Sequence, residues 1–250
     1  MGSTRLYGKV LKKVCDKPLL LLILERLKKS KTLDEIIIAT TRKKRDDAIV
    51  ELAEKYGFKY FRGSESDCLD RHYKAAKKLR LKYIAKTTSD CCLIDPAVVD
   101  KIVNFFFKNY PKYDYVSNIN PPTYPNGQDI EIFTFEALEK TWLEARTLED
   151  REHTTTYMRA HPEKFLSYNI FLPQNRNLFK TQRWCLDYRE DYEFIKKIYE
   201  ALYVKKRIFN MNDIQNLLKI RQDILDINKH LIKFNTVHQP NIISRKKLRK

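Results

Sequence analysis

The sequence predicts an α/β protein of three layers, in which helices cover both faces of a mostly parallel central sheet. Short β-branched and aromatic runs alternate along the first half of the chain with patterns that place apolar residues on one helix face. The connections between them are short, which favours parallel strands joined by helices. The chain has 250 residues and a hydrophobic content of 43%, enough to fill the core of one large domain.

The elements of the first half follow from local signals. A helix is predicted over residues 19–29, because Asp16 and Pro18 precede an apolar run. Other helices are predicted over residues 47–56, 69–79 and 95–106, and strands over residues 36–39, 58–61, 83–88 and 113–116. In a parallel sheet the loops that follow the strands meet at one edge, where sites form.

The second half begins with a turn-rich segment. Residues 118–128 contain three prolines and Gly127, and we interpret them as a lid or a substrate-side insertion. Further elements are predicted as a strand over 129–133, a helix from Phe135, a strand near 183–186 and a helix over 190–202. Two short helical patterns follow residue 209. The predicted organisation is one domain over residues 1–205 and a small helical appendage with a basic tail over residues 206–250.

The charge is strongly positive, with 49 Lys and Arg against 32 Asp and Glu, a formal net charge of +17. An excess of this size attracts polyanions such as nucleotides, nucleic acid or an anionic membrane surface. Most of the excess is scattered lysine, which favours an ordinary solvated surface. The basic run at residues 245–250 is interpreted first as a frayed terminus and second as an interaction arm. A nucleic-acid binder ranks last, because no recognition motif accompanies the charge.

The cysteines indicate a reducing compartment. Five are present, an odd number without the C-x-x-C spacing of a zinc site, so a disulfide framework is not expected. The longest apolar run, residues 19–24, is too short to span a bilayer. We therefore expect a cytoplasmic protein without membrane insertion.

The opening stretch MGSTRLYGKVL has the composition of a phosphate-binding loop. Gly2, Ser3 and Thr4 are small and polar, while Arg5 and Lys9 are cationic. Loops of this kind hold phosphates through backbone N–H groups and positive charge. Such a loop normally follows a strand, yet only Met1 precedes it here.

Two acidic residues stand at predicted strand ends. Asp90 follows the strand at 83–88, and Asp187 lies at a strand-to-helix turn. Facing a cationic loop, they predict a site for Mg²⁺ and a triphosphate, because Mg²⁺ takes a few protein oxygens and completes its shell with phosphates and water. The alternatives are that Asp187 and Glu190 form a helix capping box and that Asp90 only accepts hydrogen bonds in a turn. His153 has no partner at ligand spacing, so metal binding is not expected of it.

Seven segments resemble one family in order and spacing. They are MGSTRLYGKVL, ELAEKYGFKYFRGSESDCLDRHYKAA, SDCCLIDP, YDYVSN, PPTYPNGQDIEIFTFEALE, REHTTTYM and RWCLDYREDYEFI. The chain resembles the spore coat polysaccharide biosynthesis protein F family, which is similar to the cytidylyltransferases for 3-deoxy-manno-octulosonate and acylneuraminate. The resemblance implies a Rossmann-like nucleotide-diphospho-sugar transferase fold over residues 1–205. It also implies transfer of CMP from CTP to a sugar or sugar acid, with release of pyrophosphate, in surface polysaccharide synthesis. The acceptor, the preference for CTP and the oligomeric state stay open, a homodimer among the possibilities.

The resemblance also implies roles for individual residues. The catalytic set is Arg5, Lys9, Asp90 and Asp187, of which Asp90 and Asp187 bind Mg²⁺. The nucleotide-binding set is Gly2, Ser3, Thr4, Arg5, Lys9, Ser64 and Arg71. Glu131, Arg151 and His153 match positions that face the acceptor.

The chain departs from the family pattern at its start and at single positions. Family members carry a hydrophobic strand and Gln-Ala-Arg before the loop, so a central strand of the sheet is expected to be lacking. A start assigned too late is the favoured explanation, and a truncated, inactive nucleotide-binding or scaffold homologue is the alternative. Tyr7, Lys86, Ser89 and Cys92 replace Pro, Arg, Gly and Pro of the family. Ser89 is expected to crowd the phosphates or metal, and Lys86 to lose the bidentate geometry of Arg.

Overall fold

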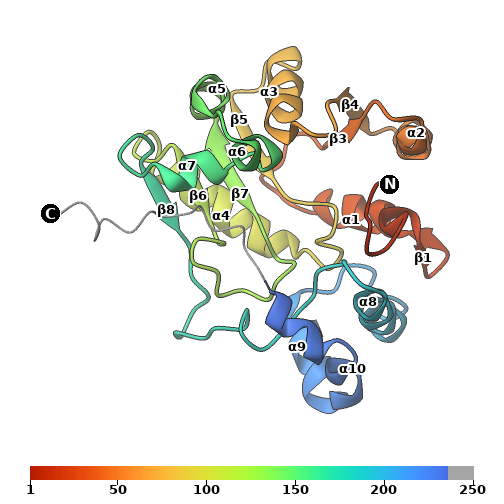
Figure 1. Cartoon of the computed structure of the whole chain (residues 1–250). Coiled ribbons are helices and arrows are strands. Elements are labelled where there is room, and N and C mark those ends of the chain that lie inside the picture. The colour runs from red at the N-terminus through yellow and green to blue at the C-terminus, as the bar shows by residue number, and fades with distance from the viewer. Residues whose placement is uncertain (236–250) are drawn as a thin grey trace, which may run out of the picture.

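The computed structural model describes residues 1–235, and the predicted basic run at 245–250 lies outside them. Figure 1 shows the arrangement of the elements. The helices are α1 (Leu19–Leu27), α2 (Asp47–Lys55), α3 (Cys68–Lys78), α4 (Pro96–Lys108), α5 (Phe135–Glu144), α6 (Leu148–Glu152), α7 (Thr156–Ala160), α8 (Arg189–Leu202), α9 (Met211–Ile220) and α10 (Gln222–Asp226), with 3₁₀ turns η1 (Lys9–Leu11), η2 (Lys44–Asp46) and η3 (Lys229–Phe234). The strands are β1 (Lys13–Val14), β2 (Lys17–Pro18), β3 (Ile37–Thr41), β4 (Lys59–Gly63), β5 (Tyr83–Lys86), β6 (Tyr115–Ser117), β7 (Glu131–Thr134) and β8 (Ser167–Asn169).

The main sheet is mixed, in the order β5-β7-β6-β8. Strand β7 runs antiparallel to both β5 and β6, and β6 is parallel to β8. The α/β class is confirmed. The expectation of a mostly parallel sheet is wrong, because two of the three strand pairs in the main sheet are antiparallel. The reason is the connection: β6 leads into β7 through the turn-rich segment rather than through a helix, and a return without a crossover places the strands antiparallel.

Strands β3 and β4 form a separate parallel pair. Within residues 1–235 no ladder joins this pair to the main sheet, so one edge of β3 and one edge of β5 have no strand partner. The small hairpin β1–β2 precedes α1.

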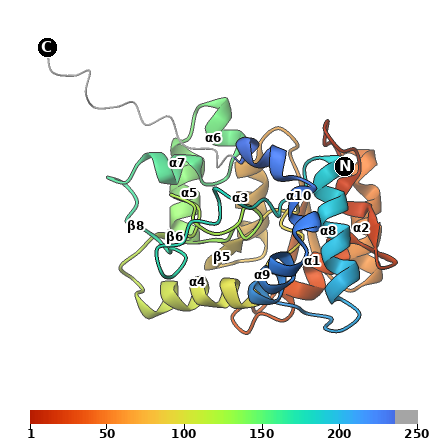
Figure 2. The same cartoon turned by 90° about the horizontal axis from the view of Figure 1, so that it is seen from below.

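Alternate side chains of the main sheet belong to two different cores, which defines the three layers. Val116 and Ile132 pack with α1, α4 and α8 in one core. Tyr115 and Phe133 pack with α3, α5 and α7 in the other. Figures 1 and 2 show the helices on both sides of the strands. The predicted three-layer arrangement is therefore confirmed.

Side-chain caps fix where the main helices begin. Asp95 accepts a hydrogen bond from the N–H of Ala97 at the start of α4, and Pro96 occupies the first turn. Asp67 accepts from the N–H of Asp70 at the start of α3. Both caps hold the loops that follow β4 and β5 in place.

The strand predicted near residues 183–186 is wrong, since the segment makes only an isolated bridge between Arg183 and Asn126. Gly127 has a φ of +107°, and a Cβ there would lie 2.7 Å from the Trp184 carbonyl carbon. The backbone segments at Gly127 and Trp184 therefore approach too closely for a side chain at position 127. Sequence reasoning also missed β8, whose exposed and half-buried residues give no alternating pattern.

The C-terminal helices pack on the main core. The buried Arg26 side chain donates to the carbonyl of Phe209, 2.8 Å away, and to that of Ile94. Phe209 is fully buried in the same core as α1, α4 and α8. The segment after residue 206 thus shares its apolar core with the rest of the chain.

We expect Phe209→Ala to lower the free energy of unfolding by about 3–5 kcal/mol, because it empties a buried ring site. Phe171→Ala is the matched control, since Phe171 is 50% exposed, and its effect should stay within about 0.5 kcal/mol. Urea unfolding followed by circular dichroism measures both. Equal destabilisation by the two variants would contradict the shared core.

Candidate active site

The opening loop is anchored to a segment far along the chain. The Lys9 ammonium donates to the Leu186 carbonyl at 2.7 Å and to Asp187 Oδ1 at 2.9 Å. Gly8 turns the backbone with a φ of +65°, and Val10 is buried against α1 and α2. Lys9 and Val10 together hold the loop in place.

Asp187 lies among three cations. Besides Lys9, the guanidinium groups of Arg5 and Arg183 each lie 3.2 Å from one of its oxygens. Burial disfavours the carboxylate, but these charges, led by Lys9, lower the pKa of Asp187 below its ordinary value. Asp187 therefore stays ionised at neutral pH.

The capping-box interpretation of Asp187 and Glu190 is wrong. Helix α8 begins at Arg189, with Tyr188 as its N-cap. Asp191, in the first turn, accepts from the N–H groups of Asp187 and Tyr188, which precede the helix, at 3.0 Å each. Asp191 is completely buried and also binds the Arg183 guanidinium, with Nε 2.9 Å away. Its carboxylate thus caps the helix and leaves the side chain of Asp187 to the cations.

Asp90 is brought to the same place from the loop after β5. The N–H of Leu186 donates to the Asp90 carbonyl at 3.0 Å. Burial opposes the charge on Lys9, but Asp90 and then Asp187 raise the pKa of its ammonium. The charges of two carboxylates that are distant in the sequence therefore both act on the Lys9 ammonium.

The charges of this cluster balance. Arg5, Lys9 and Arg183 face Asp90, Asp187 and Asp191, which are equal numbers of cations and carboxylates. Within residues 1–235 no group of three or more His, Cys, Asp or Glu side chains is arranged to hold a metal ion. The donor set fits Mg²⁺ as a shared ion, because Mg²⁺ uses one or two protein carboxylates when phosphates supply the rest.

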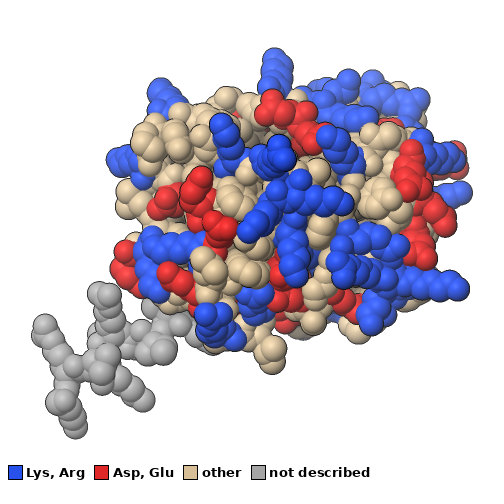
Figure 3. All heavy atoms as spheres, turned by 90° about the horizontal axis from the view of Figure 1, so that it is seen from above, with Lys and Arg blue, Asp and Glu red and all other residues tan. Residues whose placement is uncertain are grey.

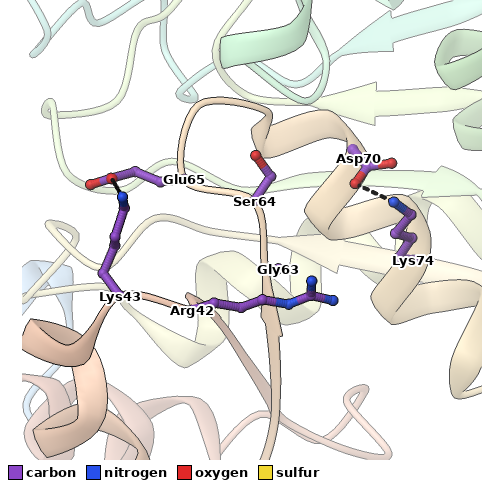
Figure 4. Close-up of a pocket in the computed structure, with 7 residues that line it drawn as sticks. All are labelled: Arg42, Lys43, Gly63, Ser64, Glu65, Asp70 and Lys74. Atoms are coloured by element: carbon purple, nitrogen blue, oxygen red, sulfur yellow. Dashed lines mark ion pairs between the residues drawn. The ribbon is translucent and has the colours of Figure 1, made fainter.

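Ser64 and Arg71 lie together at the end of β4. The Arg71 guanidinium donates to the Ser64 carbonyl, and the Ser64 hydroxyl accepts from the N–H of Asp67 at 3.1 Å. Ser64 lines a cavity of about 500 Å³, shown in Figure 4. Its cationic lining residues, which sequence reasoning missed, are Arg42, Lys43 and Lys74.

Glu131 is buried in a polar cluster between β5, β6 and β7. It is the ladder partner of Lys86, whose ammonium lies 2.5 Å from Glu131 Oε1. Glu131 Oε2 accepts from the Tyr115 hydroxyl at 2.7 Å and from the Thr155 hydroxyl. Burial opposes the charge, but Lys86 and Arg159 lower the pKa of Glu131 to about 2. Lys86 binds one oxygen of Glu131, and the Tyr115 and Thr155 hydroxyls bind the other. This carboxylate therefore does not need the bidentate geometry of Arg.

Arg151 and His153 occupy α6 and its end. The Arg151 guanidinium binds Asp67, with Nη2 2.6 Å from the carboxylate, and also donates to the Trp142 carbonyl. In this structure it ties α6 to the cap of α3. His153 is half-buried, and its N–H donates to the Glu149 carbonyl at 3.2 Å.

The departures from the family pattern fall in different surroundings. Ser89 is exposed and Tyr7 is 69% exposed, whereas Cys92 is completely buried in the main core. The Cys92 carbonyl accepts from the buried Tyr199 hydroxyl at 2.8 Å. Cys92 therefore acts as a small core residue.

Cys68, which sequence reasoning passed over, lies at the first position of α3. Its sulfur accepts from Arg71 Nη2 at 3.1 Å and lies 3.4 Å from His72 Nδ1 and 3.6 Å from the Thr154 hydroxyl. Burial disfavours the thiolate, but His72, followed by Arg71, lowers its pKa to about 6. The sequence signal for this low pKa is the spacing, because Arg and His three and four residues after a cysteine lie on the same face of a helix.

The surface charge is spread rather than gathered. Figure 3 shows Lys and Arg over much of one face, with Asp and Glu among them. Over residues 1–235 no helix is both long and apolar enough to cross a bilayer.

The layered fold and a cationic loop that faces Asp90, after β5, and Asp187, before α8, are typical of an α/β transferase that binds nucleotides. A family model described as Cytidylyltransferase matches residues 1–220. The chain therefore belongs to the cytidylyltransferase family and is a nucleotidyltransferase, as its motifs predict.

Relatives and one solved structure agree with this assignment. The chain is 40% identical over 237 residues to the uncharacterized protein MJ1063 of Methanocaldococcus jannaschii, covering 94% of this chain and 90% of the relative. It is 33% identical over 210 residues to the spore coat polysaccharide biosynthesis protein SpsF of Bacillus subtilis, covering 80% and 83%. A cytidylyltransferase structure from Leptospira borgpetersenii superposes with a TM-score of 0.84 at 35% identity, covering 90% and 92%.

We expect Glu131→Gln to lower the free energy of unfolding by about 3–5 kcal/mol at pH 7, because it leaves the buried Lys86 charge unpaired. The pKa of Glu131 is lowered on folding, so its contribution is complete above about pH 4.5 and is lost as the pH falls towards 2. Urea unfolding between pH 2.5 and 7 measures both effects. The exposed Glu163→Gln is the control, and a variant as stable as this control would contradict the buried ion pair.

We expect alkylation of Cys68 by iodoacetamide to rise with a midpoint near pH 6, because the thiolate is the reacting species. Cys15 is an internal control, since it is also half-buried but burial raises its pKa. Peptide mass spectrometry after timed labelling follows each thiol separately. A shared midpoint near pH 9 for both residues would contradict the role of Arg71 and His72.

Proposed function

We propose that this cytidylyltransferase transfers CMP from CTP to a sugar or sugar acid and releases pyrophosphate. The observation that carries the proposal is the position of the Lys9 ammonium. It belongs to the cationic opening loop, donates to Asp187, and has its pKa raised by the charge of Asp90. The acceptor oxygen would attack the α-phosphorus while its proton passes to water. The bond between the α-phosphorus and the oxygen that bridges to the β-phosphate would break, and pyrophosphate would leave. Arg5 and Lys9 are placed to offset the charge that moves onto pyrophosphate.

The balanced charge of the cluster supports a role for Mg²⁺. A triphosphate adds several negative charges to a site whose own cations are already matched, so it needs a divalent ion to accompany it. We propose Asp90 and Asp187 as the protein ligands of this ion. When bound, Mg²⁺ would neutralise phosphate charge and hold the triphosphate in position. The chain's own part is to fix Asp187 through Arg183 and Asp191, and to fix Asp90 through the hydrogen bond from Leu186.

The nucleotide would extend from the opening loop towards the end of β4. Gly2, Ser3 and Thr4 supply loop backbone, and Ser64 lines the cavity of about 500 Å³ beside Arg71. Glu131, Arg151 and His153 lie on the side of α6 and β7, which we assign to the acceptor. The Bacillus subtilis relative is named for polysaccharide synthesis, and we propose surface polysaccharide as the destination of the product. The five free thiols suit a cytoplasmic setting, which we also propose.

We expect CTP- and Mg²⁺-dependent pyrophosphate release that Asp90→Asn and Asp187→Asn each reduce by about 100-fold or more, because either change removes a proposed metal ligand. A coupled pyrophosphate assay with a panel of sugar acids and neutral sugars measures the rate, and EDTA should abolish it. Asp34→Asn, an exposed carboxylate remote from the cluster in sequence, is the control.

Calorimetry separates this proposal from an inactive homologue. The wild-type protein should bind CTP with a heat that depends on Mg²⁺. Pyrophosphate release unaffected by both aspartate variants, or no CTP binding and no release with any acceptor, would overturn the proposal.

A further inference from the structure

The side chain of Asn235, at the end of η3, forms four hydrogen bonds, which uses both donors and both acceptor positions of its amide. Its Oδ1 accepts from Arg183 Nη1 and from Asn126 Nδ2, each 3.1 Å away. Its Nδ2 donates to the carbonyls of Phe179 at 2.7 Å and Gln182 at 3.2 Å. One side chain therefore joins the end of η3 to the turn-rich segment and to the segment that contains Arg183.

Arg183 is the contact through which Asn235 reaches the charge cluster. Arg183 is only 2% exposed. Its Nε and Nη2 bind Asp191 at 2.9 and 3.1 Å, and Nη2 also lies 3.2 Å from Asp187 Oδ2. Its Nη1 donates to the Asn235 amide. A guanidinium that lost this last partner would hold a buried donor without an acceptor, and it would shift to find one.

The chain just before Asn235 packs on the same part of the site. Asn228 is 1% exposed, and its Nδ2 donates to the Arg183 carbonyl at 2.9 Å. Phe234 stacks on the Tyr188 ring, with the ring centroids 6.0 Å apart. Figures 1 and 2 show α10, which leads into this segment, beside α8. The segment over residues 228–235 therefore contacts residues that precede and follow the proposed metal ligand at position 187.

We propose that Asn235 is a positioning residue of the active site, which acts through Arg183 to hold the Asp187 carboxylate in place for the proposed Mg²⁺ ion. The inference rests on the proposed function, in which Asp187 is a protein ligand of that ion. A carboxylate turns about its side-chain bonds, and the hydrogen bonds behind it decide which oxygen faces the metal. Arg183 binds Oδ2, which leaves Oδ1 on the side of the cationic loop.

An amide suits this position better than a carboxylate. Aspartate at position 235 would still accept from Arg183, but its second oxygen would face the carbonyls of Phe179 and Gln182 that the Asn235 amide now binds. Its negative charge would also compete with Asp187 for the guanidinium. We therefore expect Asn235→Asp to impair the site as Asn235→Ala does.

Calorimetry of CTP binding over a series of Mg²⁺ concentrations is the main test. Asn235→Ala should raise the Mg²⁺ concentration needed for half-maximal CTP binding by about 10-fold or more, the effect usual for a residue that orients a metal ligand. At saturating Mg²⁺ and CTP, kcat should stay within about threefold of the wild-type value, because every proposed ligand is still present. An unchanged Mg²⁺ requirement would overturn the inference.

Asn210→Ala is the matched control. Asn210 is the N-cap of α9, and its Oδ1 accepts from the N–H of Asp213 at 2.9 Å. The control removes a hydrogen-bonded asparagine from the same C-terminal region without touching Arg183. It should lower the melting temperature but leave the Mg²⁺ requirement at the wild-type value. Equal changes in that requirement for the two variants would show a general loss of stability instead and would contradict a positioning role.

A double substitution tests whether Arg183 carries the effect. Arg183→Lys keeps the charge but removes Nη1, the atom that Asn235 binds. In this background Asn235→Ala should change the Mg²⁺ requirement by less than about twofold, because the two residues then no longer interact. An effect as large as in the wild-type background would place the action of Asn235 elsewhere and refute the proposed route.

Nuclear magnetic resonance gives a readout that needs neither nucleotide nor metal. The Nε–H signal of Arg183, assigned through its own side-chain connectivities in protein with isotope-labelled arginine, should shift or broaden in Asn235→Ala and not in Asn210→Ala. The same signal in both variants would be fatal to the inference. A changed signal in a protein whose wild-type form binds no CTP with Mg²⁺ would support the link from Asn235 to Arg183, and the proposed function alone would fail.

Discussion

The contact between the Lys9 ammonium and the segment at Leu186 and Asp187 is the constraint on which the site depends. It fixes a loop from the start of the chain against the beginning of α8. The hydrogen bond from Leu186 to the Asp90 carbonyl then fixes the loop after β5 to the same segment. Three parts of the chain meet here, and each supplies at least one charged group.

The cost of burying these charges explains the surrounding residues. Asp187 stays ionised because cations surround it, and Arg183 stays in place because Asp191 balances it. Asp191 in turn caps α8 and accepts from Asn228 at 2.9 Å. The η3 segment beyond α10 thereby supports the orientation of a cation near the centre of the site. The packing of the C-terminal helices therefore helps to orient Arg183 beside Asp187.

A second set of buried charges lies across the main sheet. Lys86 and Glu131 are ladder partners on β5 and β7, so the antiparallel pairing of these strands places the ion pair directly. Burial raises the pKa of Asp129 to about 7, and the charges of Asp90 and Glu131 add to this effect. Within residues 1–235 Arg159 forms no salt bridge, although its charge helps to lower the pKa of Glu131.

The sequence by itself determined the α/β class, most of the helices and strands, and the residues at the strand ends. Those depend on local signals: apolar periodicity, caps such as Asp95, and polar residues that follow apolar runs. The motifs were specific enough to identify the family. Only the tertiary structure decided that β7 runs antiparallel, that residues 183–186 are not a strand, and that Asp191 rather than Asp187 caps α8. It also decided that Arg151 binds Asp67 and that Arg159 has no carboxylate partner among residues 1–235, because charge pairing depends on which distant segments packing brings together.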